Sequence, residues 1–212
     1  ERSPRRDRAS CAGRRGAARQ KWGAGDVAGK KGVVQGRGNV GWHLCAMLSG
    51  AGGTLIVTDT NSARASGAAA TFGASVVAPD EIFGVDADIF VPCAMGAVIN
   101  DETVEVLKVE IVGGAANNQL ARREHGVRLS ERGILYAPDF VINAGGMIRV
   151  ASEIEGFDEP LVNRRVQAIG DTLAAIFERV DAEGIPTECA AMEIAEDRLK
   201  AARVRNAATL AA

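Results

Sequence analysis

The sequence predicts an α/β fold in which a doubly wound, mostly parallel sheet is followed by C-terminal helices. Short apolar runs alternate with segments of helical periodicity, and a glycine-rich turn joins the first run to a helix. The apolar runs then stop after Gly146. Short strands that are apolar on both faces and alternate with helices are typical of parallel sheets covered on both sides.

Six of the apolar runs are expected to be strands, at residues 31–35, 55–57, 76–77, 88–91, 109–112 and 134–136. Helices are expected between them at residues 39–49, 61–72 and 101–107, with Asn100 or Asp101 capping the last one. After Gly146 the periodicity predicts helices at residues 147–155, 161–183 and 187–205. The longest of these carries a nearly ideal apolar stripe that includes Val162, Val166, Ile169, Leu173, Ile176, Phe177 and Val180.

The chain divides into four expected regions. Residues 1–16 are Arg-rich and lack periodicity, which favours a disordered or foreign extension over a nucleic-acid-binding arm or a targeting peptide. Residues 17–150 are expected to form the α/β domain, beginning with the end of a helix at residues 17–22. Residues 151–206 are expected to form the C-terminal helices, and residues 207–212 a frayed tail.

Composition excludes several classes of protein. The net charge of -2 argues against nucleic acid as the main partner. No apolar run approaches the roughly 20 residues of a membrane helix, and the chain does not open on an apolar signal segment. The four cysteines are far apart and form no metal-ligand motif; they are Cys11, Cys45, Cys93 and Cys189. We therefore expect a cytoplasmic protein without a metal site.

The most specific local motif is Gly36-Arg37-Gly38-Asn39-Val40-Gly41, which follows the first strand and opens a helix. Gly36 permits a tight turn, Gly38 leaves room for a pyrophosphate, and Gly41 lets the helix pack closely on the strand. The free N–H groups at the start of the helix attract phosphate. The motif in this setting predicts a Rossmann-type dinucleotide-binding fold, in which all six residues contact the cofactor. The Arg37 side chain is expected either to touch a phosphate or to point into solvent.

An acidic residue, Asp59, ends the second predicted strand at the distance expected in such folds, about 20 residues beyond the glycine motif. Its carboxylate can accept hydrogen bonds from the adenosine ribose and would repel a 2′-phosphate, so the sequence favours NAD over NADP. The alternative is that Asp59 caps the next helix.

Three further stretches each follow a predicted strand: 92–100 (PCAMGAVIN), 113–119 (GGAANNQ) and 137–146 (APDFVINAGG). Ligands bind at the carboxyl ends of strands in open parallel sheets. Together with QGRGNVG and VTDTN, these stretches resemble the C-terminal domain of the Glu/Leu/Phe/Val dehydrogenase superfamily, over about residues 20–206. Within it, the sequence is most similar to leucine (branched-chain amino-acid) dehydrogenases.

The resemblance implies roles for further residues. Cys93 and Ala94 would line the cleft near the adenosine and ribose, while Asn117 and Asn143 would lie near the nicotinamide or the substrate. An Asn side chain can donate to and accept from a carboxamide or a ribose hydroxyl. The alternative for each Asn is a turn in which it bonds its own backbone.

The resemblance also implies an activity, the NAD-dependent oxidative deamination of a branched-chain L-amino acid to a 2-oxo acid and ammonia. In this family the catalytic lysine comes from an N-terminal domain, which would precede residue 17. The lysines present here are outside any such motif: Lys21, Lys30, Lys31, Lys108 and Lys200. We therefore assign no catalytic residue, and expect the C-terminal helices to expose apolar surface meant for that domain, favouring self-association or a homo-oligomer.

Two alternatives remain at this point. The chain could be a non-catalytic or vestigial NAD-binding module, in which case no lysine-bearing half would belong to it. It could also be another oxidoreductase, such as a hydroxyacid dehydrogenase, which would need a catalytic His with a carboxylate partner. The candidates are His43, on the helix after the glycine motif, and His125, expected in an Arg-flanked loop. Surface or packing roles are more common for histidines in such places.

Overall fold

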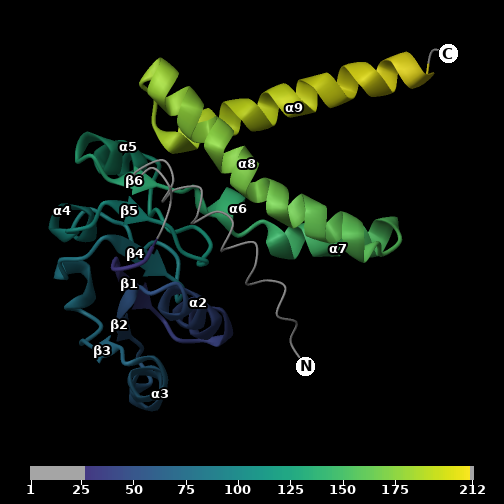
Figure 1. Ribbon diagram of the computed structural model, residues 1–212. Helices are drawn as coiled ribbons and strands as arrows, with labels where there is room; N and C mark the ends of the chain where they lie inside the picture. The colour runs from purple at the N-terminus through teal and green to yellow at the C-terminus, as the bar shows by residue number, and fades with distance from the viewer. Residues whose placement is uncertain (1–26, 211–212) are drawn as a thin grey trace.

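Six parallel strands form one sheet in the computed structural model, which describes residues 27–210 (Figure 1). The expectations for residues 1–16, 17–22 and 211–212 lie outside this range. The strands follow the order β3-β2-β1-β4-β5-β6. Their bounds are β1 Lys31–Gln35, β2 Thr54–Thr58, β3 Ser75–Val76, β4 Ile89–Pro92, β5 Ile111–Val112 and β6 Leu135–Tyr136. The predicted fold class is therefore confirmed.

The strand order reverses between β1 and β4. Val33 in β1 pairs with Ile56 in β2 on one side and with Phe90 in β4 on the other. The chain therefore runs outward from β1 to β3, crosses back, and runs outward again from β4 to β6. In sheets of this kind, ligands bind at the carboxyl ends of the strands where the strand order reverses.

Helices cover both faces of the sheet. Their bounds are α2 Asn39–Gly50, α3 Ser62–Phe72, η1 Ile82–Gly84, α4 Thr103–Val106, α5 Glu124–Glu131, α6 Asp139–Ile142, α7 Gly145–Glu155, α8 Glu159–Glu183 and α9 Thr187–Leu210. Within residues 27–210, no helix combines the length and apolarity needed to cross a membrane.

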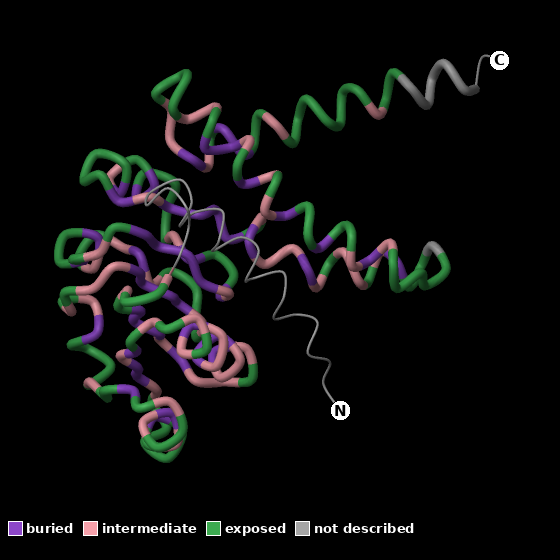
Figure 2. Tube along the Cα trace, in the orientation of Figure 1, coloured by how far each residue is buried: buried purple, intermediate pink, exposed green. Residues whose placement is uncertain are grey.

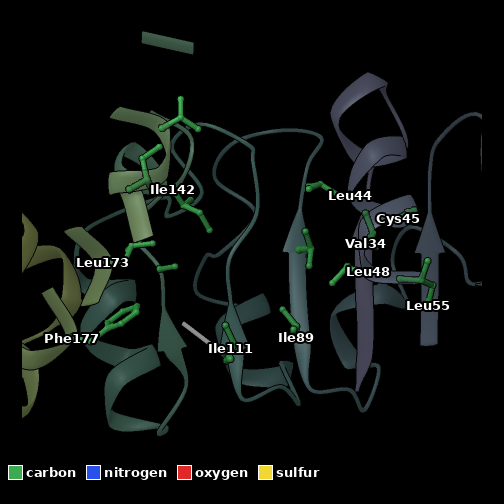
Figure 3. Close-up of a cluster of buried hydrophobic side chains, with 14 of the residues drawn as sticks. Val34, Leu44, Cys45, Leu48, Leu55, Ile89, Ile111, Ile142, Leu173 and Phe177 are labelled. Atoms are coloured by element: carbon green, nitrogen blue, oxygen red, sulfur yellow. The ribbon is translucent and has the colours of Figure 1, made fainter. Parts of the chain in front are cut away.

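Alternate strand residues feed two separate hydrophobic clusters. Val34 faces the cluster that includes α2 and α8, whereas its neighbour Val33 faces the cluster under η1, α4 and α5. In β4, Val91 and Phe90 divide in the same way. Because side chains alternate across a strand, a strand buried on both faces is apolar throughout. The first cluster is drawn in Figure 3.

The apolar stripe of α8 packs on the sheet itself. Leu173 and Phe177 are almost wholly buried in the same cluster as Ile111 and Ile142 (Figure 3). The expectation that this helix exposes apolar surface for a second domain is therefore wrong for α8. Exposed apolar side chains occur instead on α7 and on α9, much of which projects away from the sheet (Figures 1 and 2).

Several expected boundaries shift. The third strand is 75–76 instead of 76–77, the fourth and sixth each begin one residue later than expected, and the fifth is reduced to 111–112. The helix α4 begins at Thr103 because the Asn100 side chain accepts hydrogen bonds from the N–H groups of Glu102 and Thr103, both at 3.0 Å. At the other end, α7 crosses the expected boundary at residues 150/151, and α9 runs to Leu210, into the segment expected to be frayed.

The expected loop position of His125 is wrong. His125 lies in α5 and is buried, with Nδ1 accepting a hydrogen bond from the Arg122 N–H at 3.0 Å and Nε2 lying 3.2 Å from Asp101 Oδ1. The hydrogen bond to His125, followed by that to Arg122, lowers the pKa of the Asp101 carboxyl. His125 thus joins α5 to the segment before α4 through its contact with the exposed Asp101 carboxylate.

A pair of matched substitutions tests the packing of α8. Leu173→Ala removes a side chain that is 0% exposed in the first cluster, whereas Leu199→Ala removes one on α9 that is 59% exposed. We expect Leu173→Ala to lower the free energy of unfolding by about 2–5 kcal/mol, because it leaves a cavity. Leu199→Ala should change it by no more than about 0.5 kcal/mol. Urea denaturation measures both, and equal effects would contradict this packing.

Candidate functional site

The glycine turn brings β1, α2 and the loop after β4 into direct contact. A Cβ on Gly41 would lie 2.0 Å from the Gly36 carbonyl oxygen, so only glycine fits there. Gly36 has a φ of +89°, and a Cβ on it would lie 2.6 Å from the Ala94 Cβ. The Cys93 N–H donates to the Gln35 carbonyl at 2.7 Å. The predicted pair Cys93–Ala94 therefore packs against the glycine turn.

Gly38, in contrast, faces open space. No atom lies within 4 Å of a Cβ built on Gly38, although it is the N-cap residue of α2. Its side of the turn is therefore open to a ligand, and the first N–H groups of α2 have no side-chain cap. Asn39 is exposed and Val40 is partly buried against the core. A helix start of this kind, with an uncrowded backbone, favours a phosphate group.

The Asp59 carboxylate is held beside this turn by backbone groups. Its Oδ2 accepts a hydrogen bond from the Arg37 N–H at 2.6 Å, and its Oδ1 accepts one from the Asn61 N–H at 2.8 Å. The N-cap of α3 is Asn61, whose side chain accepts from the Arg64 N–H at 3.3 Å. The alternative that Asp59 itself caps the helix is therefore wrong, and its carboxylate lies next to the glycine turn.

The Arg37 side chain does not point into solvent, which was one of its two expected positions; contact with a phosphate remains a prediction. Its Cζ lies 4.0 Å from the centre of the Trp42 ring, so the guanidinium stacks on α2 and does not extend into solvent. A Cβ on Gly67 of α3 would lie 2.9 Å from the Nη1 of Arg37. Arg37 therefore fills the seam between α2 and α3. Neither Trp42 nor Gly67 was singled out in the sequence, because their pairing with Arg37 depends on the fold.

Asn117 and Asn143 come together although 26 residues separate them. The Nδ2 of Asn143 donates to the Oδ1 of Asn117 at 2.6 Å, so the loops after β5 and β6 meet at the carboxyl edge of the sheet. Asn117 is exposed and Asn143 half-buried. The bond leaves the Nδ2 of Asn117 and the Oδ1 of Asn143 as a donor and an acceptor on neighbouring side chains. A carboxamide or a hydroxyl presents the complementary groups.

Two residues that hold these loops together were not singled out in the sequence. The Gln119 N–H donates to Asp139 Oδ2 at 2.8 Å, and the Gln119 side chain donates to the Gly114 carbonyl at 2.9 Å. Both residues are buried. They occur in the stretches 113–119 and 137–146, but an amide and a carboxylate buried inside a loop leave no periodic signal in a sequence.

Backbone strain is concentrated in the loops after β4 and β5. Among the described residues other than glycine, positive φ angles occur at Ala97 (56°) and Asn118 (52°). The Ala97 N–H donates to the Asn118 carbonyl at 2.6 Å, so the two strained residues support each other. A strained backbone conformation persists only where the surrounding structure fixes it, and such residues often occur at functional sites.

Glu188, in the first turn of α9, lies behind this part of the site. Its carboxylate reaches Gly126 of α5, where a Cβ would lie 2.2 Å from the Glu188 Oε2. Burial, reinforced by the nearby Asp139 carboxylate, raises the pKa of Glu188 to about 7. Arg123 opposes this shift and Glu124 adds to it. Glu188 therefore packs α9 against α5, near the Asp139 carboxylate that holds the site loops.

The described lysines lie away from this edge of the sheet. Lys30 and Lys31 are at the amino end of β1, where Lys30 forms an ion pair with Asp88 at 3.1 Å. Lys108 precedes β5, and Lys200 is on α9. The arrangement of the glycine turn, the Asp59 carboxylate and the three loops is typical of a dinucleotide-binding domain, and no described lysine adds a base to it.

Comparisons with known proteins identify the family to which this dinucleotide-binding arrangement belongs. Residues 56–206 match the model of the Glutamate/Leucine/Phenylalanine/Valine dehydrogenase family. Leucine dehydrogenase from Bacillus cereus is 47% identical over 187 residues, 88% of this chain and 51% of that protein. Leucine dehydrogenase from Thermoactinomyces intermedius is 47% identical over 90% of this chain. The chain belongs to the Glutamate/Leucine/Phenylalanine/Valine dehydrogenase family.

A solved structure agrees with this assignment. L-tryptophan dehydrogenase from Nostoc punctiforme superposes with a TM-score of 0.91 at 42% identity, covering 94% of this chain and 60% of that one. The chain spans about half the length of the curated leucine dehydrogenases that it matches, at 51% and 52%.

Because the pKa of Glu188 is raised, we expect the free energy of unfolding to depend on pH. A carboxyl whose pKa is raised in the folded state stabilises the fold fully below its unfolded value of 4.5, and this stabilisation is lost as the pH rises through about 7. From pH 5 to pH 8, the free energy of unfolding should fall relative to Glu188→Gln by an amount on the order of 1 kcal/mol, because solvent screens part of the effect.

Chemical denaturation at each pH measures this difference. Glu178→Gln, an exposed substitution on α8, controls for the loss of one negative charge. Parallel pH profiles for the wild-type chain and Glu188→Gln would show that Glu188 does not titrate in this window.

Proposed function

We propose that this chain is the cofactor-binding part of an NAD-dependent L-amino-acid dehydrogenase that acts on branched-chain, leucine-like substrates. The products would be the 2-oxo acid and ammonia, and we place the enzyme in the cytoplasm. The observation that carries the proposal is the open side of Gly38 at the start of α2, next to the Asp59 carboxylate. In dinucleotide-binding folds the pyrophosphate binds at the glycine turn, and the ribose binds to an acidic residue about 20 residues further along the chain. Gly38 and Asp59 have this arrangement.

Each end of the dinucleotide would have its own residues. The pyrophosphate would lie on the backbone of Gly36–Gly41, with Gly38 leaving room for it. Asp59 would accept hydrogen bonds from the adenosine ribose, and Cys93 and Ala94 would line the cleft beside it. The Asn117–Asn143 pair would face the nicotinamide end or the substrate, where its remaining donor and acceptor fit a carboxamide or a hydroxyl.

The chemistry would be shared with residues outside this chain. Bound NAD would accept a hydride from the α carbon of the amino acid. Water must then attack the resulting imine carbon, which requires a general base near the substrate. We propose that this base is a lysine from the half of the enzyme that this chain does not span. The residues described here would bind and orient the cofactor.

The surface for that half would be the exposed apolar face around α7. Met147, Val150 and Ile154 recur along the helix at helical spacing, and all three are exposed, Ile154 by 83%. Phe140 and Phe157 extend this α7 face at either end of the helix. An apolar patch rimmed by polar residues favours a protein contact. Without the other half, the α7 face would promote self-association of the chain.

A cofactor titration tests the binding site. We expect NADH fluorescence to report saturable binding to the purified chain, and Gly38→Ala to weaken that binding at least about tenfold because its methyl group would occupy the place of the pyrophosphate. Gly38→Ala should leave the melting temperature unchanged, since no atom crowds that position. Gly50→Ala, equally uncrowded but at the far end of α2, is the matched control and should bind NADH normally.

Asp59→Ala should also weaken NADH binding, since the ribose hydroxyls would lose their acceptor. Normal NADH binding by both Gly38→Ala and Asp59→Ala would show that the cofactor does not use this edge of the sheet.

A complementation assay tests the enzyme activity against the alternative of a non-catalytic NAD-binding module. We expect the chain alone to show no leucine oxidation, and activity to appear when it is fused to the lysine-bearing half of a leucine dehydrogenase. Met147→Ser, on the exposed α7 face, should weaken that activity more than Leu199→Ser on α9. NADH binding without any activity in a folded fusion would favour the non-catalytic module.

A further inference from the structure

The guanidinium group of Arg37 is enclosed between two helices. On one side it stacks on the Trp42 ring of α2, with Cζ 4.0 Å from the ring centre. On the other side it lies so close to Gly67 of α3 that a Cβ there would be 2.9 Å from Nη1 and 3.5 Å from Cζ. Glycine inside a helix is less favourable than alanine. Gly67 therefore lowers the stability of α3 at the position where the helix must make room for the Arg37 guanidinium.

Two nitrogens of this guanidinium group make no hydrogen bond within the described residues. Within the described part of the chain, Nε and Nη1 of Arg37 are buried and have no hydrogen-bond partner. An arginine side chain stays protonated, and burying a charge without a partner is unfavourable. In the described residues the neighbouring Asp59 carboxylate makes no hydrogen bond to Nε or Nη1; its oxygens accept from the N–H groups of Arg37 and Asn61. An anionic group near the guanidinium could supply such a partner.

The Arg37 charge lies near the residue that would bind the adenosine ribose of the cofactor. Arg37 follows the first glycine of the turn, and its own N–H is bonded to Asp59 at 2.6 Å. The helix α3, against which the guanidinium lies, begins three residues after Asp59. A carboxylate that binds the ribose hydroxyls repels a 2′-phosphate, whereas a nearby arginine accommodates one. This site holds both groups on adjacent elements.

We propose that Arg37 reduces the preference of the site for NAD over NADP by strengthening the binding of NADP. This inference rests on the cofactor site proposed above. The positive charge offsets the repulsion between Asp59 and the 2′-phosphate, so that the chain binds NADPH as a second, weaker ligand instead of rejecting it. In a partly buried seam a unit charge acts over several ångströms, and Arg37 can contribute without leaving Trp42.

Paired titrations with NADH and NADPH test the proposal. We expect the wild-type chain to bind NADPH roughly tenfold more weakly than NADH, and Arg37→Leu to weaken NADPH binding a further tenfold or so while NADH binding changes less than about threefold. Gly67→Ala is the matched variant that keeps the charge and favours the helix, but its methyl group displaces the guanidinium. It should change the NADPH-to-NADH ratio without lowering the melting temperature.

The outcomes separate the two proposals. If Arg37→Leu weakens NADH and NADPH binding equally, Arg37 only holds the loop, and the inference is overturned. It is also overturned if the wild-type chain binds NADH but shows no NADPH binding. If the folded chain binds neither, the cofactor site itself fails and the inference fails with it. Gly67→Ala provides the same test if Arg37→Leu does not fold.

Discussion

The close approach of two backbone segments at Gly36 and Gly41 is the constraint on which the site depends. With 2.0 Å between the Gly36 oxygen and a Cβ built on Gly41, any side chain there would push α2 away from β1. Because α2 stays close, its first N–H groups lie at the carboxyl edge of the sheet, and the turn reaches Asp59 through the Arg37 N–H. The same approach lets Ala94 pack on the turn, which ties β4 to it.

On the other half of the sheet, buried hydrogen bonds fix the positions of the loops, whereas at β1 the close packing of glycine residues fixes the turn. The bond between Gln119 and Asp139 fixes the loops after β5 and β6, and so leaves Asn117 and Asn143 side by side at the surface. One half of the site is therefore shaped by close backbone packing and the other by hydrogen bonds. Both leave the candidate ligand-binding groups accessible while their supports are buried, as expected of a preorganised site. The exposed α7 face continues from the second half.

Much of this arrangement could be predicted from the sequence because its signals are local. The strands show as short apolar runs, and the glycine motif and Asp59 have spacings set by one strand and one helix. The features that could not be predicted depend on contacts between distant segments. Examples are Arg37 stacked on Trp42 and facing Gly67, and His125 in a helix with few apolar residues. The stripe of α8 was visible in the sequence, but a pattern of buried residues does not say which surface buries them.

The central claim is that the dinucleotide binds at the carboxyl edge of the sheet, across the switch between β1 and β4. Amide hydrogen exchange of the chain with and without saturating NADH tests this directly, because it reports where the ligand slows exchange. The account predicts slower exchange in residues 36–41 and 58–61. Unchanged exchange there, or slowing confined to the opposite edge around Lys108 and Glu110, would contradict it.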